Sequence, residues 1–427
     1  MRLAFVTPRY GAEIAAGAEH ACRLLAEQIS TRHDVDVITT CARDEVTWKS
    51  EYPEGADRIR GVLVRRFLTT PTQDPEAVGR VSQSVFTAAH SRADELEWLR
   101  LTGPWSPGLI EFLKRHHRNY DALAFFSYRH ATTVHGITIA PERSLLFPWL
   151  TLDPALRLGI TQETLSGAAA VGYCSPAERR LLQLHTRGPA PHEEFVGVGI
   201  HPPPHYTYPR LQQDQPEPDE TDSEDDEAFP DPDEDRSKPY LTGRGAPFRR
   251  RHRLDGRIVV YGGRVEPDNG CEELIEYFDS YASEGGDADL VLLGVKMMKI
   301  PNERYLRLAG VLPARERMAA FEAADVTAAP APDDLIAETV LESFAAGTPV
   351  LASARNAAAV EHCRRANAGL YYNNRAEFVC ALQMLMSNDA LRDDLGRNGR
   401  RYVQEHFRWD AVIGRFERLL SKVKGSK

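Results

Sequence analysis

The strongest constraint on the fold of this 427-residue chain is an acidic, proline-rich segment that divides it into two parts. Residues 214–235 contain thirteen Asp or Glu residues and no Lys or Arg, and large aliphatic residues are rare from about residue 202 onward. Such a segment cannot bury enough apolar surface to offset its chain entropy. We therefore predict a disordered linker over residues 202–255, which ends in the basic stretch "RGAPFRRRHR". The alternative interpretation is an acidic docking tail for a basic partner.

On each side of this linker the sequence alternates between strand and helix patterns. The N-terminal part runs from the apolar "RLAFVT" through a loop of small residues to the helical "AEHACRLLAEQIS" and the strand "DVDVITT". The C-terminal part begins with "GRIVVYGGRV" and continues through "NGCEELIEYFDSY" and "ADLVLLG". This alternation predicts an α/β fold with parallel sheets covered by helices. We expect one domain over residues 1–201, a second over 256–408, and a terminal helix over 409–427 that crosses back to the first domain.

Composition excludes several functional classes. The net charge is −10, and the acidic segment alone contributes −13, so the remainder sums to about +3 without a dominant basic stripe. This pattern argues against nucleic-acid binding. The chain has no apolar run of the roughly 20 residues that a membrane span needs and no secretory-type start, and its six cysteines are spaced singly. We expect a cytoplasmic protein without a metal site, which associates with the inner face of a membrane at most peripherally.

Two stretches have the composition of a phosphate-binding site. In "YGGRVEPDNGCEELIEYF", residues 261–278, a strand ends at two glycines, Arg264 follows, and a helix is expected from about Gly270. In "DDLIAETVLESFAAGTPVLAS", residues 333–353, acidic residues flank the start of a second helix. An arginine beside a helix N-terminus is suited to bind an anion, because a planar cation and unpaired N–H groups converge. Taken alone, Arg264 could equally be a surface arginine after a turn.

Together these stretches resemble the family 4 glycosyltransferases, which have the GT-B fold of two facing Rossmann-like domains with a cleft between them. Arg264, Pro267 and Gly270 match the family's Gly-Arg, Pro and Lys-Gly positions, and "AAGTPV" matches its Ala-Gly-x-Pro-Val. Asp334 and Glu342 match its two acids with seven residues between them. The stretches "HCRRANAGLYY", "RRYVQEHFRWDAV" and "DVDVITTCARDEVTWKSEYPEG" resemble a bacterial subgroup.

The resemblance implies a retaining transfer of a hexose from a UDP- or GDP-sugar to a cell-envelope glycan or lipid acceptor, without a metal or cofactor. Arg264 would neutralise the leaving phosphate, Asp334 would hold hydroxyls of the donor sugar, and Glu342 would accept hydrogen bonds from the ribose. A partner glycosyltransferase is a further interaction that the resemblance leaves open. The other residues expected to bind the donor are Gly17, Gly263, Asn269, Ile336, Ala337, Glu338 and Thr339, and the residues assigned to the acceptor side or left open are Glu19, Thr151 and Asp153.

The sequence departs from the family pattern at four places. Asn269 replaces a lysine, Asp334 replaces a glutamate, and the N-terminal glycine pair reads Ala16-Gly17. A His-Asp-Glu run of the subgroup reads Thr151, Leu152 and Asp153. His130, Lys296 or Arg315 could replace the missing phosphate cation. These departures motivate the alternative of a catalytically impaired protein that binds nucleotide-sugar or serves as a partner subunit. A sugar-nucleotide epimerase of the same fold is a third interpretation, which the motifs around Arg264 and Glu342 favour less.

Overall fold

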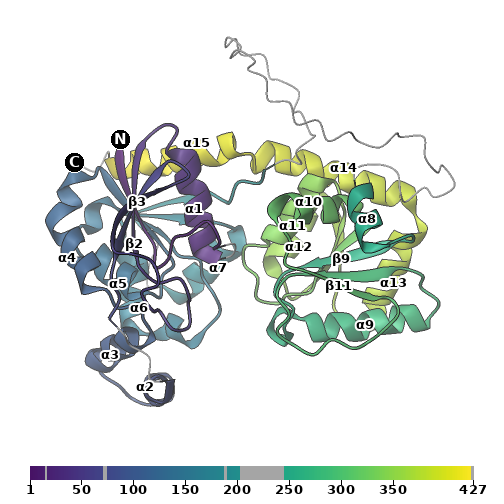
Figure 1. Ribbon diagram of the computed structural model, residues 1–427, viewed down its shortest axis with the longest axis horizontal. Helices are drawn as coiled ribbons and strands as arrows, with labels where there is room; N and C mark the ends of the chain where they lie inside the picture. The colour runs from purple at the N-terminus through teal and green to yellow at the C-terminus, as the bar shows by residue number, and fades with distance from the viewer. Residues whose placement is uncertain (15–16, 71–74, 187–189, 202–244, 425–427) are drawn as a thin grey trace, which may run out of the picture.

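The computed structural model describes residues 1–14, 17–70, 75–186, 190–201 and 245–424. These residues form two α/β lobes side by side, with the last two helices running across both (Figure 1). The N-terminus and the C-terminal end lie in the same lobe. Most of the predicted acidic linker, residues 202–244, lies outside the described residues.

The N-terminal lobe is built on an eight-stranded sheet of order β3-β4-β2-β1-β5-β6-β7-β8. All neighbouring pairs are parallel except β3 with β4, which form an antiparallel edge hairpin. Its strands are β1 (Arg2–Val6), β2 (Asp34–Thr40), β3 (Gly55–Ile59), β4 (Val62–Phe67), β5 (Ala122–Phe126), β6 (Ser144–Phe147), β7 (Ala170–Tyr173) and β8 (His192–Phe195). Its helices are α1 (Gly17–Ile29), α2 (Pro75–Thr87), α3 (Arg92–Thr102), α4 (Pro107–His116), α5 (Ala131–Ile137), α6 (Gly159–Gly167) and α7 (Pro176–His185).

The C-terminal lobe is built on a six-stranded parallel sheet of order β11-β10-β9-β12-β13-β14. Counted along this domain, the order is 3-2-1-4-5-6, the Rossmann arrangement, and it reverses between β9 and β12. Its strands are β9 (Ile258–Gly262), β10 (Asp289–Leu293), β11 (Leu306–Gly310), β12 (Val326–Ala329), β13 (Val350–Ser353) and β14 (Gly369–Tyr372). Its helices are α8 (Ala246–His252), α9 (Cys271–Ser283), α10 (Ala314–Ala323), α11 (Glu338–Ala346), α12 (Ala357–Ala366), α13 (Arg375–Ser387) and α14 (Asp389–His406).

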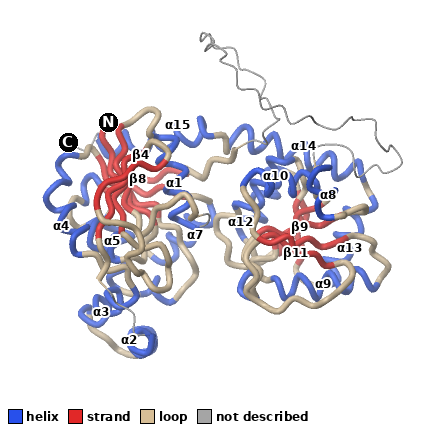
Figure 2. The backbone as a smooth tube through the Cα atoms, viewed as in Figure 1, coloured by secondary structure: helices blue, strands red, loops and turns tan. Residues whose placement is uncertain are grey.

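The central strand β9 shows why both faces of this sheet are covered. Every residue of "IVVYG" is buried. Because side chains alternate along a strand, Val259 and Tyr261 join the core under α9 and α13, whereas Ile258 and Val260 join the core under α8 and α10. Helices therefore flank the red strands of this lobe in Figure 2. The predicted α/β class with two parallel-sheet domains is confirmed.

The predicted linker was too long at its C-terminal end. Residues 246–252 form helix α8, and Phe248 and Arg249 are buried. A Cβ atom at Gly245 would overlap the backbone of Ala323, so the segment packs directly against the end of α10. The described residues from 245 onward therefore belong to the C-terminal lobe.

The last helix, α15 (Trp409–Lys424), packs on the N-terminal lobe. Val412 and Phe416 of α15 join the same core as Phe5 of β1 and Leu25 of α1. The chain thus passes between the lobes twice among the described residues, once before residue 202 and once near residue 408. No described helix has the length and apolarity required for a transmembrane segment.

Candidate functional site

The candidate site lies at the carboxyl ends of β9 and β12, where the strand order of the C-terminal sheet reverses. In open α/β sheets such a reversal creates the place where ligands bind. Arg264 follows β9, and α11 follows β12. The Thr339 hydroxyl donates to the carbonyl of Gly262 at 2.9 Å, which ties the first turn of α11 to the end of β9. The structure thus brings the Arg264 and α11 motifs to one edge of the sheet.

The backbone around Arg264 is held by several neighbours. The Tyr261 hydroxyl donates to the Arg264 carbonyl at 2.8 Å, and Asn269 Nδ2 donates to the same oxygen at 3.1 Å. The Arg264 side chain is 56% exposed and pairs with Glu266 at 2.9 Å. Gly263 stands where a Cβ atom would lie 2.6 Å from the Tyr261 hydroxyl oxygen, so the turn requires glycine. Arg264 is therefore accessible on a fixed backbone.

Asn269 does not replace the missing cation. Its amide also donates to Glu266 Oε1 at 2.9 Å, so both of its hydrogen bonds serve the local turn Pro267–Asn269. Lys296 is exposed and its backbone pairs with Val265, next to Arg264. Of the three cations considered from the sequence, Lys296 therefore lies closest to this turn along the sheet.

The other two candidate cations are placed differently. Arg315 is exposed on α10. His130 lies in the N-terminal lobe, where burial lowers its pKa to about 3, so its ring is neutral. Neither residue therefore supplies a buried positive charge next to Arg264.

Asp334 caps the loop that leads into α11. Its Oδ1 accepts hydrogen bonds from the backbone N–H groups of Ile336 at 3.0 Å and Ala337 at 2.9 Å. Burial raises the pKa of Asp334, and these two N–H groups oppose the rise. Ala337 has a left-handed backbone with φ 54°, which is uncommon for a residue with a side chain and marks local strain. The short Asp334 side chain thus holds this strained loop.

The loop before α11 also contacts the N-terminal lobe. Ile336 packs with Ala21, Cys174 and Val198. Glu338 Oε1 lies 3.8 Å from Nδ1 of His20 on α1. Burial and the neighbouring Glu342 raise the pKa of Glu338 to about 8. Glu338 is therefore positioned between the two domains.

Glu342 is bound by an arginine that the sequence did not single out. Arg317 on α10 contacts the Glu342 carboxylate through Nε at 3.0 and 3.1 Å and through Nη2 at 2.7 Å. Nη2 also donates to the Thr339 hydroxyl at 3.2 Å. The signal available in the sequence was weak, because Arg317 is one of several charged residues in "ARERMAAFEA".

The N-terminal lobe contains the residues predicted for the acceptor side or left open, and also Gly17, which was predicted to bind the donor. Glu19, in the first turn of α1, is buried and pairs with Arg9 at 3.1 Å, so its carboxylate has a cation partner. Gly17, the first residue of α1, has φ 76°, a backbone conformation that favours glycine. Ala16, the residue before it, lies outside the described residues.

Thr151 and Asp153 are hydrogen-bonded to each other, and Asp153 is also hydrogen-bonded to other residues of the N-terminal lobe. The Thr151 hydroxyl donates to Asp153 Oδ2 at 3.0 Å, and the Tyr128 hydroxyl donates to the same oxygen at 2.7 Å. Asp153 Oδ1 accepts from the N–H of Ala155 and so caps a short helical turn. These contacts position the loop after β6.

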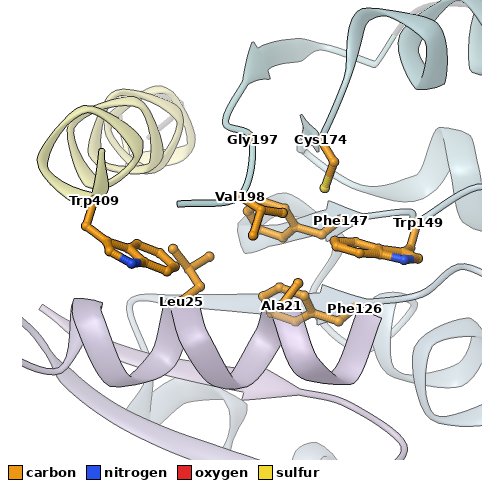
Figure 3. Close-up of a pocket in the computed structure, with 9 residues that line it drawn as sticks. All are labelled: Ala21, Leu25, Phe126, Phe147, Trp149, Cys174, Gly197, Val198 and Trp409. Carbon is orange, nitrogen blue, oxygen red and sulfur yellow. The ribbon is translucent and has the colours of Figure 1, made fainter. Parts of the chain in front are cut away.

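A small apolar pocket lies beside this loop, where the chain crosses between the lobes. Figure 3 shows side chains from α1, β5, β6 and the start of α15 pointing into it. Its lining is apolar apart from a thiol, so it lacks the charged groups that a phosphate needs. The lining residues are Ala21, Leu25, Phe126, Phe147, Trp149, Cys174, Gly197, Val198 and Trp409. Among the described residues there is also no group of three or more His, Cys, Asp or Glu side chains placed to hold a metal ion.

Known proteins resemble the chain in both sequence and fold. A family model described as "Glycosyl transferases group 1" matches residues 246–402. The putative glycosyltransferase YtcC of Bacillus subtilis is 24% identical over 208 residues, which cover 43% of this chain. This chain therefore matches about half (51%) of the length of that relative.

Solved structures match the whole length of the chain. Sucrose-phosphate synthase from Thermosynechococcus elongatus superposes with a TM-score of 0.67 at 16% identity, covering 100% of both chains. HepE from Anabaena, in complex with UDP and glucose, superposes with a TM-score of 0.66 at 13% identity, covering 98% of this chain and 99% of HepE. The chain thus has the GT-B fold, and its residues 246–402 match the family model of the group 1 glycosyl transferases.

Proposed function

We propose that this protein is a retaining glycosyltransferase that moves a hexose from a UDP- or GDP-sugar to a cell-envelope glycan or lipid acceptor. The observation that carries the proposal is the convergence of Arg264, the N-terminus of α11 and Glu342 at the strand-order reversal between β9 and β12. A leaving nucleoside diphosphate develops negative charge, and a fixed guanidinium with helix N–H groups stabilises such charge. HepE, which has the same fold, was solved with UDP and glucose, in keeping with this donor class.

Each group has a defined part in the proposed reaction. The Arg264 guanidinium neutralises the departing phosphate, and the N–H groups at Glu338 and Thr339 point from the start of α11 at the same phosphate. Glu342 accepts hydrogen bonds from the ribose hydroxyls, and Asp334 holds hydroxyls of the donor sugar through its remaining carboxylate oxygen. The acceptor hydroxyl attacks on the face from which the diphosphate leaves, and its proton passes to the leaving phosphate oxygen, so charge and protons balance.

A titration with nucleotides and nucleotide-sugars tests this proposal. UDP, GDP, UDP-glucose and GDP-mannose are added in a thermal-shift assay, and product release is followed by mass spectrometry. A bound ligand at about 100 times its dissociation constant should stabilise the protein by roughly 2.7 kcal/mol. Arg264→Ala and Glu342→Ala should abolish both binding and slow hydrolysis, whereas Arg315→Ala, at an exposed position on α10, should not.

A second candidate is a member of the same fold that binds nucleotide-sugar without transferring the sugar, or acts as a partner subunit of another glycosyltransferase. Asn269 favours this second candidate, because its amide group donates both hydrogen bonds within the local turn and the residue adds no positive charge. If nucleotides bind but no sugar is released or transferred, even with Asn269→Lys, the second candidate replaces the first. If no nucleotide binds, both donor-site proposals fail.

A further inference from the structure

Arg317 makes all the hydrogen bonds and ion pairs of the Glu342 carboxylate that occur among the described residues. Its Nε lies 3.1 Å from Oε1 and 3.0 Å from Oε2, and its Nη2 lies 2.7 Å from Oε2. The two side chains are only 25% and 20% exposed. A guanidinium that approaches a carboxylate with two nitrogens fixes its orientation as well as its charge.

The surroundings of Arg317 leave the guanidinium little freedom. A Cβ atom at Gly262 would lie 3.0 Å from Nη1 and from Nη2, so the end of β9 leaves space for this arginine. The Cζ atom lies 5.0 Å from the centre of the Phe321 ring, within the range of a cation–π contact. Nη2 also donates to Thr339, whose hydroxyl is bonded to the Gly262 carbonyl. The arginine is therefore anchored to α10, β9 and α11 at once.

The charge of Arg317 also matters, because acids crowd this turn of α11. Burial alone would lower the pKa of Arg317, but the Glu342 carboxylate reverses the effect and the pKa is raised. A carboxylate can accept about four hydrogen bonds, and Arg317 makes one contact to Oε1 of Glu342 and two to Oε2. The remaining capacity to accept hydrogen bonds, chiefly on Oε1, is available to a ribose hydroxyl group.

On the basis of the proposed function, we propose that Arg317 is a positioning residue for the nucleoside, which keeps the Glu342 carboxylate turned toward the ribose hydroxyls. Arg317 acts through Glu342 and does not itself touch the diphosphate. Without it, Glu342 lies beside Glu338 without a cation and loses its fixed rotamer. We expect binding of a nucleoside diphosphate to weaken about ten- to hundredfold, the range of a hydrogen bond to a charged group.

The test compares ligands with and without the ribose hydroxyls. UDP and GDP, and their 2′,3′-dideoxy forms, are titrated by calorimetry against the wild type, Arg317→Ala, Arg317→Lys and Arg315→Ala. The Arg317→Ala variant should bind the ribose form about ten- to hundredfold more weakly and the dideoxy form as the wild type does. Arg317→Lys should restore part of the loss, and Arg315→Ala, on the same helix, should bind both forms normally. Glu342→Ala added to Arg317→Ala should cause no further loss.

The outcomes separate this inference from the proposed function. If the wild type binds UDP or GDP and Arg317→Ala behaves like Arg315→Ala, the inference is wrong and the proposed function stands. An equal loss for the dideoxy ligand means that Arg317 binds the diphosphate directly, which also overturns the inference. If the wild type binds neither nucleotide, both proposals fail. Thermal melting checks that each variant is folded. If Arg317→Ala does not fold, Arg317→Lys takes its place in the comparison. Weaker binding of UDP or GDP but not of the dideoxy forms then supports the inference, and equally weakened binding of both forms overturns it.

Discussion

At the scale of single residues, Glu338 is a titratable group on the surface between the two domains. Its carboxylate lies 3.8 Å from the His20 ring, a distance typical of an ion pair. However, burial, with a smaller contribution from Arg23, lowers the pKa of His20 to about 4. The pKa of Glu338 is about 8, because burial, Glu342 and Asp334 outweigh the attraction of Arg317. Both groups are therefore neutral at pH 7, and the contact is not an ion pair.

Glu338 makes stability depend on pH in a predictable direction. Its pKa in the folded protein, about 8, lies above the ordinary value of 4.5. Between these values the folded state holds a proton that the unfolded state releases, so stability falls as pH rises from about 4.5 to about 8. Glu338→Gln should remove this decline and make the protein more stable than the wild type at pH 8.

Denaturant unfolding at a series of pH values measures the effect. Glu272→Gln is the matched control, since Glu272 is an exposed acid in the first turn of α9. The control should leave the pH dependence unchanged. The same pH slope in wild type and Glu338→Gln would show that Glu338 is ionised in the folded protein at neutral pH.

The sequence located part of this site and missed the rest for a geometric reason. Glu338 and Glu342 are four residues apart, so a helix over residues 338–346 places them on one face, and Asp334 lies in the short loop that leads into this helix. Arg317 comes from another helix, and Arg315 and Arg317, two positions apart, point in different directions. Which of them contacts Glu342 depends on how α10 rotates on the sheet, and no local pattern specifies that rotation.

At the scale of secondary-structure elements, α8 shows how tertiary contacts override a local composition. Its sequence "APFRRRH" has four basic residues, and we predicted a linker there. The structure buries Arg249, whose Nη2 pairs with Asp325 at 3.0 Å and whose Nε donates to the Ala323 carbonyl at 3.0 Å. These partners lie more than seventy residues away. The helix is therefore stabilised by the loop after α10, which the sequence of α8 cannot indicate.

Arg249→Ala should lower the free energy of unfolding by about 3 kcal/mol, because it leaves a buried carboxylate short of one cation. Asp325 keeps Arg257 at 3.1 Å, so the loss should not exceed this range. Arg250→Ala, at the neighbouring exposed position, should change stability by less than about 0.5 kcal/mol. Urea unfolding of the two variants checks the prediction, and equal midpoints would mean that the buried contacts of Arg249 contribute nothing to the stability of the domain.

At the scale of the whole molecule, the two passages of the chain between the lobes are bonded to each other. The N–H of Ile200 donates to the carbonyl of Phe407 at 2.8 Å, and the indole of Trp409 donates to His201 at 3.1 Å. Arg415 Nε donates to the Val196 carbonyl at 3.0 Å. The strand and helix patterns predicted two domains, but contacts between residues about 200 positions apart depend on the assembled lobes. The hydrogen bonds between the two passages of the chain therefore could not be derived from the sequence.

The crossing depends on Gly199, which lies against the indole of Trp409. A Cβ atom at Gly199 would overlap the ring, so Gly199→Ala should displace Trp409 and break its bond to His201. We expect a loss of about 2 kcal/mol, typical of an overpacked site, and a change in the relative placement of the lobes. Thermal unfolding measures the loss of stability, and small-angle X-ray scattering measures the change in the relative placement of the lobes.

Gly414→Ala is the control, since this position lies in α15 with no atom within 4 Å of the added Cβ. It should instead stabilise the protein by up to about 1 kcal/mol. If Gly199→Ala retains the wild-type scattering profile and melting temperature, then the contact with Trp409 does not fix the position of the domains, and the hydrogen bond from Ile200 to Phe407 is sufficient.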